Sequence, residues 1–143
     1  MNYSTYAFED LSVVLRHPAK GQYVFQGEGL GSITFAMSND VSAHDLSADG
    51  SVMTSKIKAT NGTVSISVQQ TSTANKWLRE LYNYLVNASS SEWTGCSLIA
   101  TSPVMGVTHI ATNMAFQKRP DEAYQQTGQQ VTWAFLVSNL QEY

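Results

Sequence analysis

Apolar and polar residues alternate with a period of two through most of this chain. In "GSITFAMSND", residues 31–40, Ile33, Phe35 and Met37 alternate with small polar residues, and the pattern recurs in "NGTVSISVQQ" at residues 61–70. Successive side chains of a β-strand point to opposite faces of a sheet, so this spacing predicts strands with one apolar face. The chain is therefore expected to fold mainly as antiparallel sheet.

The other segments fit the same scheme, with one exception. Further β-rich segments are "LSVVLRH", "GQYVFQGEG", "SVMTSKIKA", "CSLIATSP", "VTHIATNMAFQ" and "QQVTWAFLVSNL", and Asn61-Gly62 predicts a hairpin turn. Between about residues 73 and 87 apolar side chains recur at helical spacing instead: Trp77, Leu78, Leu81, Tyr82, Leu85 and Val86. "KRPDEAYQQTG" is expected to be an exposed connection. We expect a single domain, residues 1–143, with a β-sandwich or barrel of antiparallel strands and one flanking α-helix.

Charge is scarce. Charged residues make up 13% of the chain, against about 25% in a typical soluble domain, and the net charge is -3. Neutral polar side chains are easier to bury in an interface than charges, so this composition suits a protein covered by its own copies. It disfavours tight nucleic-acid binding, which needs clustered Lys and Arg.

The segment "DLSADGS", residues 45–51, has the oxygen spacing of a calcium loop. Counted from Asp45, the ligands would include Asp49, and a Glu should close the shell at the twelfth position. Lys56 stands there and would repel the cation. We therefore predict no metal site but a long polar loop at about residues 39–51, whose Asp and Ser side chains bond to nearby backbone groups.

No set of residues predicts catalysis or a cofactor. The histidines His17, His44 and His109 fall in separate elements, and the single cysteine, Cys96, is expected to be buried or half-buried. The glycines of "GEGLG", Gly27, Gly29 and Gly31, predict a bulge or bend. We expect a protein that is not an enzyme. The N-terminal residues lack the pattern of a secretory signal and no segment reaches the length of a membrane span, so we expect cytosolic synthesis.

Taken in order, three stretches show a family resemblance: "GQYVFQGEGLGSITFAMSNDVSAHDLSADGSVMTSKI", "NGTVSISVQQTSTANKWLRELYNYL" and "GQQVTWAFLV". They cover most of the chain, which resembles the tail tube proteins of contractile-tailed bacteriophages. The resemblance implies a β-sandwich with a flanking helix, assembled into hexameric rings that stack into a hollow tube through which DNA passes during infection. It also implies sheath, baseplate, tail terminator and tape measure proteins as partners, and a place in the virion after assembly in the host bacterial cytoplasm.

Two sets of site residues follow from the resemblance. The long polar loop is expected to lie between two inner strands, the second of them in "SVMTSKIKA", and to reach an adjacent subunit or ring, with Asp40, His44, Asp45 and Asp49 as contact residues. A conduit must not hold DNA, so uncharged and acidic side chains are expected to face the lumen: Ser32, Thr34, Ser38 and Asp40. Lys56 and Lys58 do not fit this expectation, because on an inner strand their shared face could point into the lumen and attract DNA.

Two alternatives stay open. The same fold serves tubes of contractile bacteriocins and secretion machines, with a protein cargo or none. A small ligand-binding β-sandwich, using Trp93 and Trp133 at a pocket, belongs to a different class.

Overall fold

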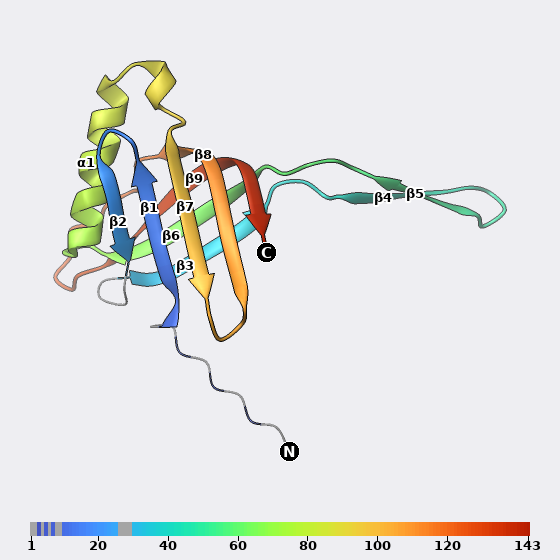
Figure 1. Cartoon of the computed structure of the whole chain (residues 1–143), viewed down its shortest axis with the longest axis horizontal. Helices are drawn as coiled ribbons and strands as arrows, with labels where there is room; N and C mark the ends of the chain where they lie inside the picture. Colours follow the sequence, from blue (N-terminus) through green and yellow to red (C-terminus); the bar gives the residue numbers. More distant parts are fainter. Residues whose placement is uncertain (1–2, 4, 6, 8–9, 26–29) are drawn as a thin grey trace.

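The alternating segments form β-strands in the structure, a computed structural model that describes residues 3, 5, 7, 10–25 and 30–143. The elements in chain order are β1 (Ser12–His17), β2 (Gly21–Phe25), β3 (Leu30–Met37), β4 (Ser42–Leu46), β5 (Val52–Lys56), β6 (Gly62–Gln69), α1 (Thr73–Asn87), the short 3-10 helix η2 (Ser90–Glu92), β7 (Cys96–Ser102), β8 (Val107–Lys118) and β9 (Gln130–Glu142). Seven strands make one antiparallel sheet in the order β2-β1-β7-β8-β9-β6-β3, while β4 and β5 pair with each other as a separate sheet (Figure 1).

The seven-stranded sheet curls into a half-barrel. The long strand β9 pairs with β6 over residues 130–137 and with β8 over residues 134–142. The two halves of the sheet thus run in different directions, with α1 along one side (Figure 1). Their facing sides meet in a core whose largest members are Trp133, Phe25, Phe135, Leu15, Ile66, Leu78, Leu81, Leu85, Leu98 and Met114. This architecture confirms the predicted class, mainly β with one flanking helix.

An irregularity in β8 lets the sheet bend. Its pairing with β7 shifts between Cys96 and Leu98, where β8 carries one extra residue. Asn113 lies there with φ of 52°, a left-handed conformation that asparagine tolerates better than most residues. As a result, Ala111 and Met114, three positions apart, are both fully buried.

The helix α1 spans Thr73–Asn87, the stretch in which the periodicity predicts it. The Ser72 side chain caps it by accepting a hydrogen bond from the Asn75 N–H. Its buried face is Ala74, Asn75, Leu78, Leu81 and Leu85. The prediction for Val86 was wrong, since that side chain is 52% exposed: it lies at the edge of the face centred on Leu78, Leu81 and Leu85.

A buried polar contact joins this helix to the sheet. The indole Nε1 of Trp133 donates to Oδ1 of Asn75 at 2.9 Å, and Nδ2 of Asn75 donates to the carbonyl of Gln70 at 2.9 Å. Trp133 and Asn75 are both buried, so each polar atom depends on the other for its partner.

The hairpin turn predicted at Asn61-Gly62 does not exist. Gly62 lies inside β6, opposite Met37 of β3 and Val137 of β9. A Cβ there would stand 2.5 Å from the carbonyl oxygen of Ala36, so this glycine permits close approach of two strands.

The bulge predicted in "GEGLG" is confirmed at Gly31, where the register between β3 and β6 shifts. Gly27 and Gly29 lie outside the described residues.

Candidate functional site

The β4–β5 hairpin projects away from the rest of the protein (Figure 1). Every residue from 36 to 58 is exposed. Two expectations need correction here: residues 39–51 are not an irregular loop, since Ser42–Leu46 is a strand, and Val52–Lys56 is not an inner strand of the main sheet. The alternation in "SVMTSKIKA" correctly predicts a strand. It does not predict which sheet the strand joins, because β4 and β5 pair only with each other across a tight turn and pack on no core.

The hairpin has two different faces, which the register defines. Ile57 N–H donates to the carbonyl of Val41 at 2.8 Å, which extends the pairing beyond β4 and β5. One face therefore carries Val41, Ala43, Asp45, Met53, Ser55 and Ile57, and we call it the apolar hairpin face. The opposite face carries Ser42, His44, Leu46, Val52, Thr54 and Lys56.

The tip of the hairpin is a hydrogen-bonded turn. The Ser47 hydroxyl donates to Oδ1 of Asp49 at 2.5 Å, and the Ser51 N–H donates to the same oxygen at 3.0 Å. These bonds lower the pKa of Asp49 to about 2, and Gly50 supplies a φ of 91°. The predicted bonding of Asp and Ser side chains to the loop is confirmed.

Within the described ranges, no group of three His, Cys, Asp or Glu residues could hold a metal ion.

The four predicted contact residues share the hairpin but do not cluster. Asp45 lies on the apolar hairpin face, His44 on the opposite face and Asp49 in the turn. Asp40 lies at the base, between β3 and β4.

Ser32 and Thr34, predicted to face the lumen, lie on the side of β3 opposite the core. They stand across from Ser67 and Ser65 of β6, which in turn pair with Thr132 and Ala134 of β9. The Ser67 and Thr132 hydroxyls are hydrogen-bonded at 2.8 Å. We call this the hydroxyl face: Ser32, Thr34, Thr63, Ser65, Ser67 and Thr132.

Few charges border that face. Lys118 of β8 stands opposite Ala134 at its edge. Ser38 is exposed just beyond β3, where its N–H donates to the carbonyl of Asn61 at 3.2 Å. Lys56 is on the projecting hairpin, away from the hydroxyl face.

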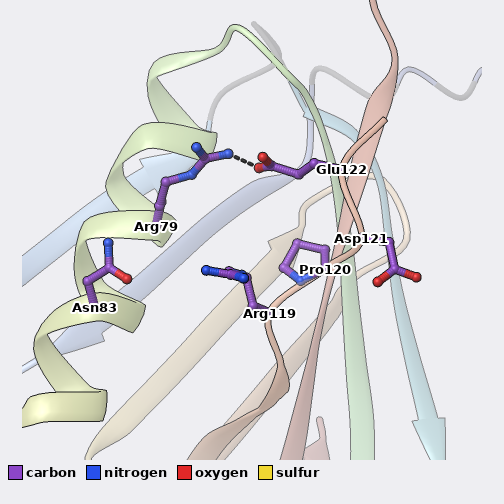
Figure 2. A pocket seen from close by; sticks show the side chains of 6 residues that line it. All are labelled: Arg79, Asn83, Arg119, Pro120, Asp121 and Glu122. Atoms are coloured by element: carbon purple, nitrogen blue, oxygen red, sulfur yellow. Dashed lines mark ion pairs between the residues drawn. The ribbon is translucent and has the colours of Figure 1, made fainter. Parts of the chain in front are cut away.

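A polar cleft of about 390 Å³ lies between α1 and the connection that follows β8. Arg79 and Glu122 form an ion pair across it, with Asn83, Arg119, Pro120 and Asp121 also on its walls (Figure 2). The Gln70 side chain donates to the Ala123 carbonyl at 3.3 Å. The predicted exposed connection is thus held along the helix, by contacts between distant segments that no local pattern reveals.

The three histidines lie in separate elements, as predicted: His17 in β1, His44 in β4 and His109 in β8. His17 is buried, with Nδ1 accepting from Ala19 N–H at 3.1 Å and Nε2 contacting the Glu92 carbonyl at 3.0 Å. Since a carbonyl can only accept, Nε2 carries the proton in this arrangement. His109 stacks on Phe35 with ring centroids 4.3 Å apart.

Cys96 and Trp133 are core residues. Cys96 is fully buried, as expected, and burial raises the pKa of its thiol to about 12. Trp133 is 0% exposed, which removes it from any ligand pocket.

Within the described part of the chain, no helix is long and apolar enough to cross a membrane.

The fold is similar to that of chains in solved structures of the anti-feeding prophage and of a contractile injection system. A chain of the anti-feeding prophage baseplate structure matches with a TM-score of 0.65 and 6% sequence identity, over 100% of this chain and 97% of that one. A chain of the anti-feeding prophage tube-terminating cap structure matches with a TM-score of 0.64 and 9% identity, over 100% of this chain and 93% of that one. A chain of the sheath-tube complex of an extracellular contractile injection system, PVC, in its extended state matches with a TM-score of 0.62 and 7% identity, over 97% of this chain and 91% of that one. At these identities the similarity shows the fold.

Family membership comes from the sequence. The family model described as bacteriophage PhiTE tail tube protein matches residues 3–143, so the chain belongs to this family of phage tail tube proteins. A search of curated proteins gives no significant match. The predicted resemblance and the structural role in the tail tube are confirmed.

Proposed function

We propose that the protein assembles head to tail into hexameric rings that stack as the inner tail tube, the conduit for DNA ejection. The observation that carries this is the open sheet. Within the described residues, β2 and β3 each pair along one side and end the row of seven strands. Open edges invite further pairing, and a ring of identical subunits closes by rotation with every edge paired.

The hydroxyl face is the proposed lumen wall. Small neutral side chains such as Ser32, Thr34 and Ser67 offer phosphates no fixed positive charge, so DNA is not held in transit. Ser38 and Asp40 continue this wall at the end of β3.

The projecting hairpin is the proposed contact with an adjacent subunit or ring. Its exposed carboxylates and imidazole, from Asp40, His44, Asp45 and Asp49, supply polar contacts there. A hairpin with no core of its own is marginally stable in water, and a neighbouring copy supplies the missing surface.

The proposed partners are sheath, baseplate and tail terminator proteins, with the tape measure protein and DNA passing through the lumen. Solved neighbours come from baseplate, sheath-tube and cap structures, which supports the first three. We place assembly in the host bacterial cytoplasm and propose no catalytic role.

A second candidate is a tube subunit of a contractile device with protein cargo or none. The similarity to an extracellular contractile injection system favours including it. Nucleic acid inside the purified particle, detected by nuclease-protected absorbance, decides for the phage tail, and its consistent absence decides for the device.

Removal of the whole hairpin tests the proposal. Ser38 and Asn61 lie opposite each other, so replacing residues 39–60 by Asn-Gly joins β3 to β6 through a two-residue turn. The wild-type chain should form tubes in negative-stain microscopy, and the shortened chain should stay folded by circular dichroism but form none. Normal tubes from the shortened chain would refute the role of the hairpin, and a wild-type chain that stays monomeric at all concentrations would refute the tube.

A further inference from the structure

An apolar stripe crosses the outer surface of the sheet half formed by β2, β1, β7 and β8. The register places Val24 opposite Val14, Val14 opposite Ile99, and Ile99 opposite Ile110. Paired residues share a face, so these four β-branched side chains form one row across four strands. We call them the β-branched stripe.

The stripe lies on the side away from the core and is open to solvent. Val24 is 41% exposed and Ile99 49%, while Val14 and Ile110 are half-buried by their neighbours. The flanking rows on the same face are polar: Ser12, Thr101 and Thr108 on one side, and Gln22, Arg16 and Ser97 on the other. A continuous apolar row with polar borders is typical of a surface that another molecule covers.

The hairpin of the same chain does not cover this stripe. Residues 42–56 are all exposed, and the hairpin projects away from the body of the protein (Figure 1). Its own apolar face also lacks a cover: Met53 is 60% exposed, Val41 46% and Ile57 41%. Two exposed apolar surfaces that cannot meet within one chain can meet between two copies.

The two surfaces match in length. Three interstrand spacings of about 4.8 Å give the stripe a length of about 14 Å, and the four residue steps from Met53 to Ile57 along the edge of β5 span about 13 Å. A hairpin laid with this edge along the stripe, perpendicular to the strands below it, therefore brings Met53 to one end of the stripe and Ile57 to the other, with Ser55 between them.

They also match in charge. Asp45 is the acidic residue of the apolar hairpin face, and Arg16 borders the stripe two positions along β1 from Val14. With β5 over the stripe, β4 lies beside it, which brings a carboxylate to the row that carries the guanidinium. Arg and Asp side chains then form a charge-assisted pair at the rim of an apolar contact.

We propose that the apolar hairpin face of one copy docks along the β-branched stripe of a second copy, with Asp45 paired to Arg16 across the contact. This inference rests on the proposed tube, because it names the surface that receives the hairpin. It assigns Val24, Val14, Ile99 and Ile110 to an interface between subunits, and leaves the hydroxyl face free for the lumen.

Cross-linking of assembled tubes tests the contact directly. Met53→Cys combined with Val24→Cys or with Ile99→Cys in one chain should give a ladder of covalent multimers on a non-reducing gel after mild oxidation of at least one pair. Cys96 does not interfere, because it is buried and its thiol pKa is raised to about 12. Thr54→Cys, on the opposite hairpin face, is the matched control and should give no ladder with either partner. Normal wild-type tubes without a ladder from either Met53→Cys pair overturn the inference and leave the tube intact.

A charge exchange provides a second readout that needs no cross-link. Arg16→Asp and Asp45→Arg should each reduce tube yield at least tenfold at low salt, and the double variant should restore it. Ile99→Asp, at an exposed position, should remain folded by circular dichroism and form no tubes. If Ile99→Asp instead forms normal tubes that no longer recruit sheath, the stripe belongs to a different partner and the inference is overturned.

Discussion

Asn75 shows how one buried residue can form hydrogen bonds with three segments of the chain. Its amide accepts from Trp133 of β9 and donates to the Gln70 carbonyl before α1, while its backbone N–H is bound by Ser72. None of this is visible in the helical periodicity, where a buried Asn interrupts the apolar stripe. It follows from the sheet bringing an indole N–H to that helix.

We expect Asn75→Ala to destabilise the folded chain by about 2–6 kcal/mol, since it leaves a buried indole donor and a backbone carbonyl without partners at about 1–3 kcal/mol each. Urea unfolding of the shortened, non-assembling chain, followed by tryptophan fluorescence, measures the change. Asn83→Ala, an exposed position of the same helix, is the control and should stay within about 0.5 kcal/mol of the parent. A loss for Asn75→Ala no larger than that of the control would contradict the role of this contact.

At the scale of elements, the pattern of side chains predicted the strands and the helix better than their positions. Alternation in β3 and β6 indicates one buried face, and the helical stripe indicates α1, because both are local consequences of burial. The hairpin was misplaced because β4 and β5 alternate without burying either face. Gly62 was misassigned because close approach of strands and a tight turn both require glycine.

The β-branched stripe could not be predicted from the sequence. Val24, Val14, Ile99 and Ile110 come from four strands and form a row only through the register of three strand pairs. The residues of the hydroxyl face were partly predicted, because Ser32 and Thr34 alternate with the core residues of one strand.

The hairpin turn has a pH dependence of its own. The pKa of Asp49 is lowered from 3.8 to about 2 by bonds from Ser47 and Ser51, so these bonds favour the turn at every pH above 3.8 and are lost as the pH falls through about 2. Titration of the Asp49 carboxyl carbon by NMR should show this low pKa. Ser47→Ala should raise it toward 3.8, while Ser55→Ala, outside the turn, should leave it unchanged; an Asp49 that titrates near 3.8 in the parent chain would show that the turn does not form in solution.

At the scale of the whole molecule, the fold separates three surfaces. The hydroxyl face lies on β3, β6 and β9, the β-branched stripe on β2, β1, β7 and β8, and the apolar hairpin face on an arm that extends beyond both (Figure 1). One half of a curled sheet can thus face a lumen while the other half faces a neighbouring subunit. Scarcity of charge is consistent with both uses.

We expect Thr34→Lys to leave tube assembly intact and to slow DNA release from purified virions several-fold, because cations repeated around the proposed lumen attract phosphates. The delay should shrink as salt is raised, since ions screen that attraction. Release is followed by the fluorescence of a DNA-binding dye. Thr34→Gln, longer but neutral, should release DNA at the parent rate, and equally fast release from both variants would place Thr34 outside the channel.

The projecting hairpin also bears on how such a filament starts. In a free subunit the hairpin packs on no core, so little free energy favours its ordered form. When two free subunits associate, the entropy cost of ordering both hairpins therefore opposes binding. A subunit that arrives at an existing end finds its docking surface already in place. Elongation is therefore expected to outpace spontaneous nucleation, which would let a preformed seed decide where, and how often, a tube begins.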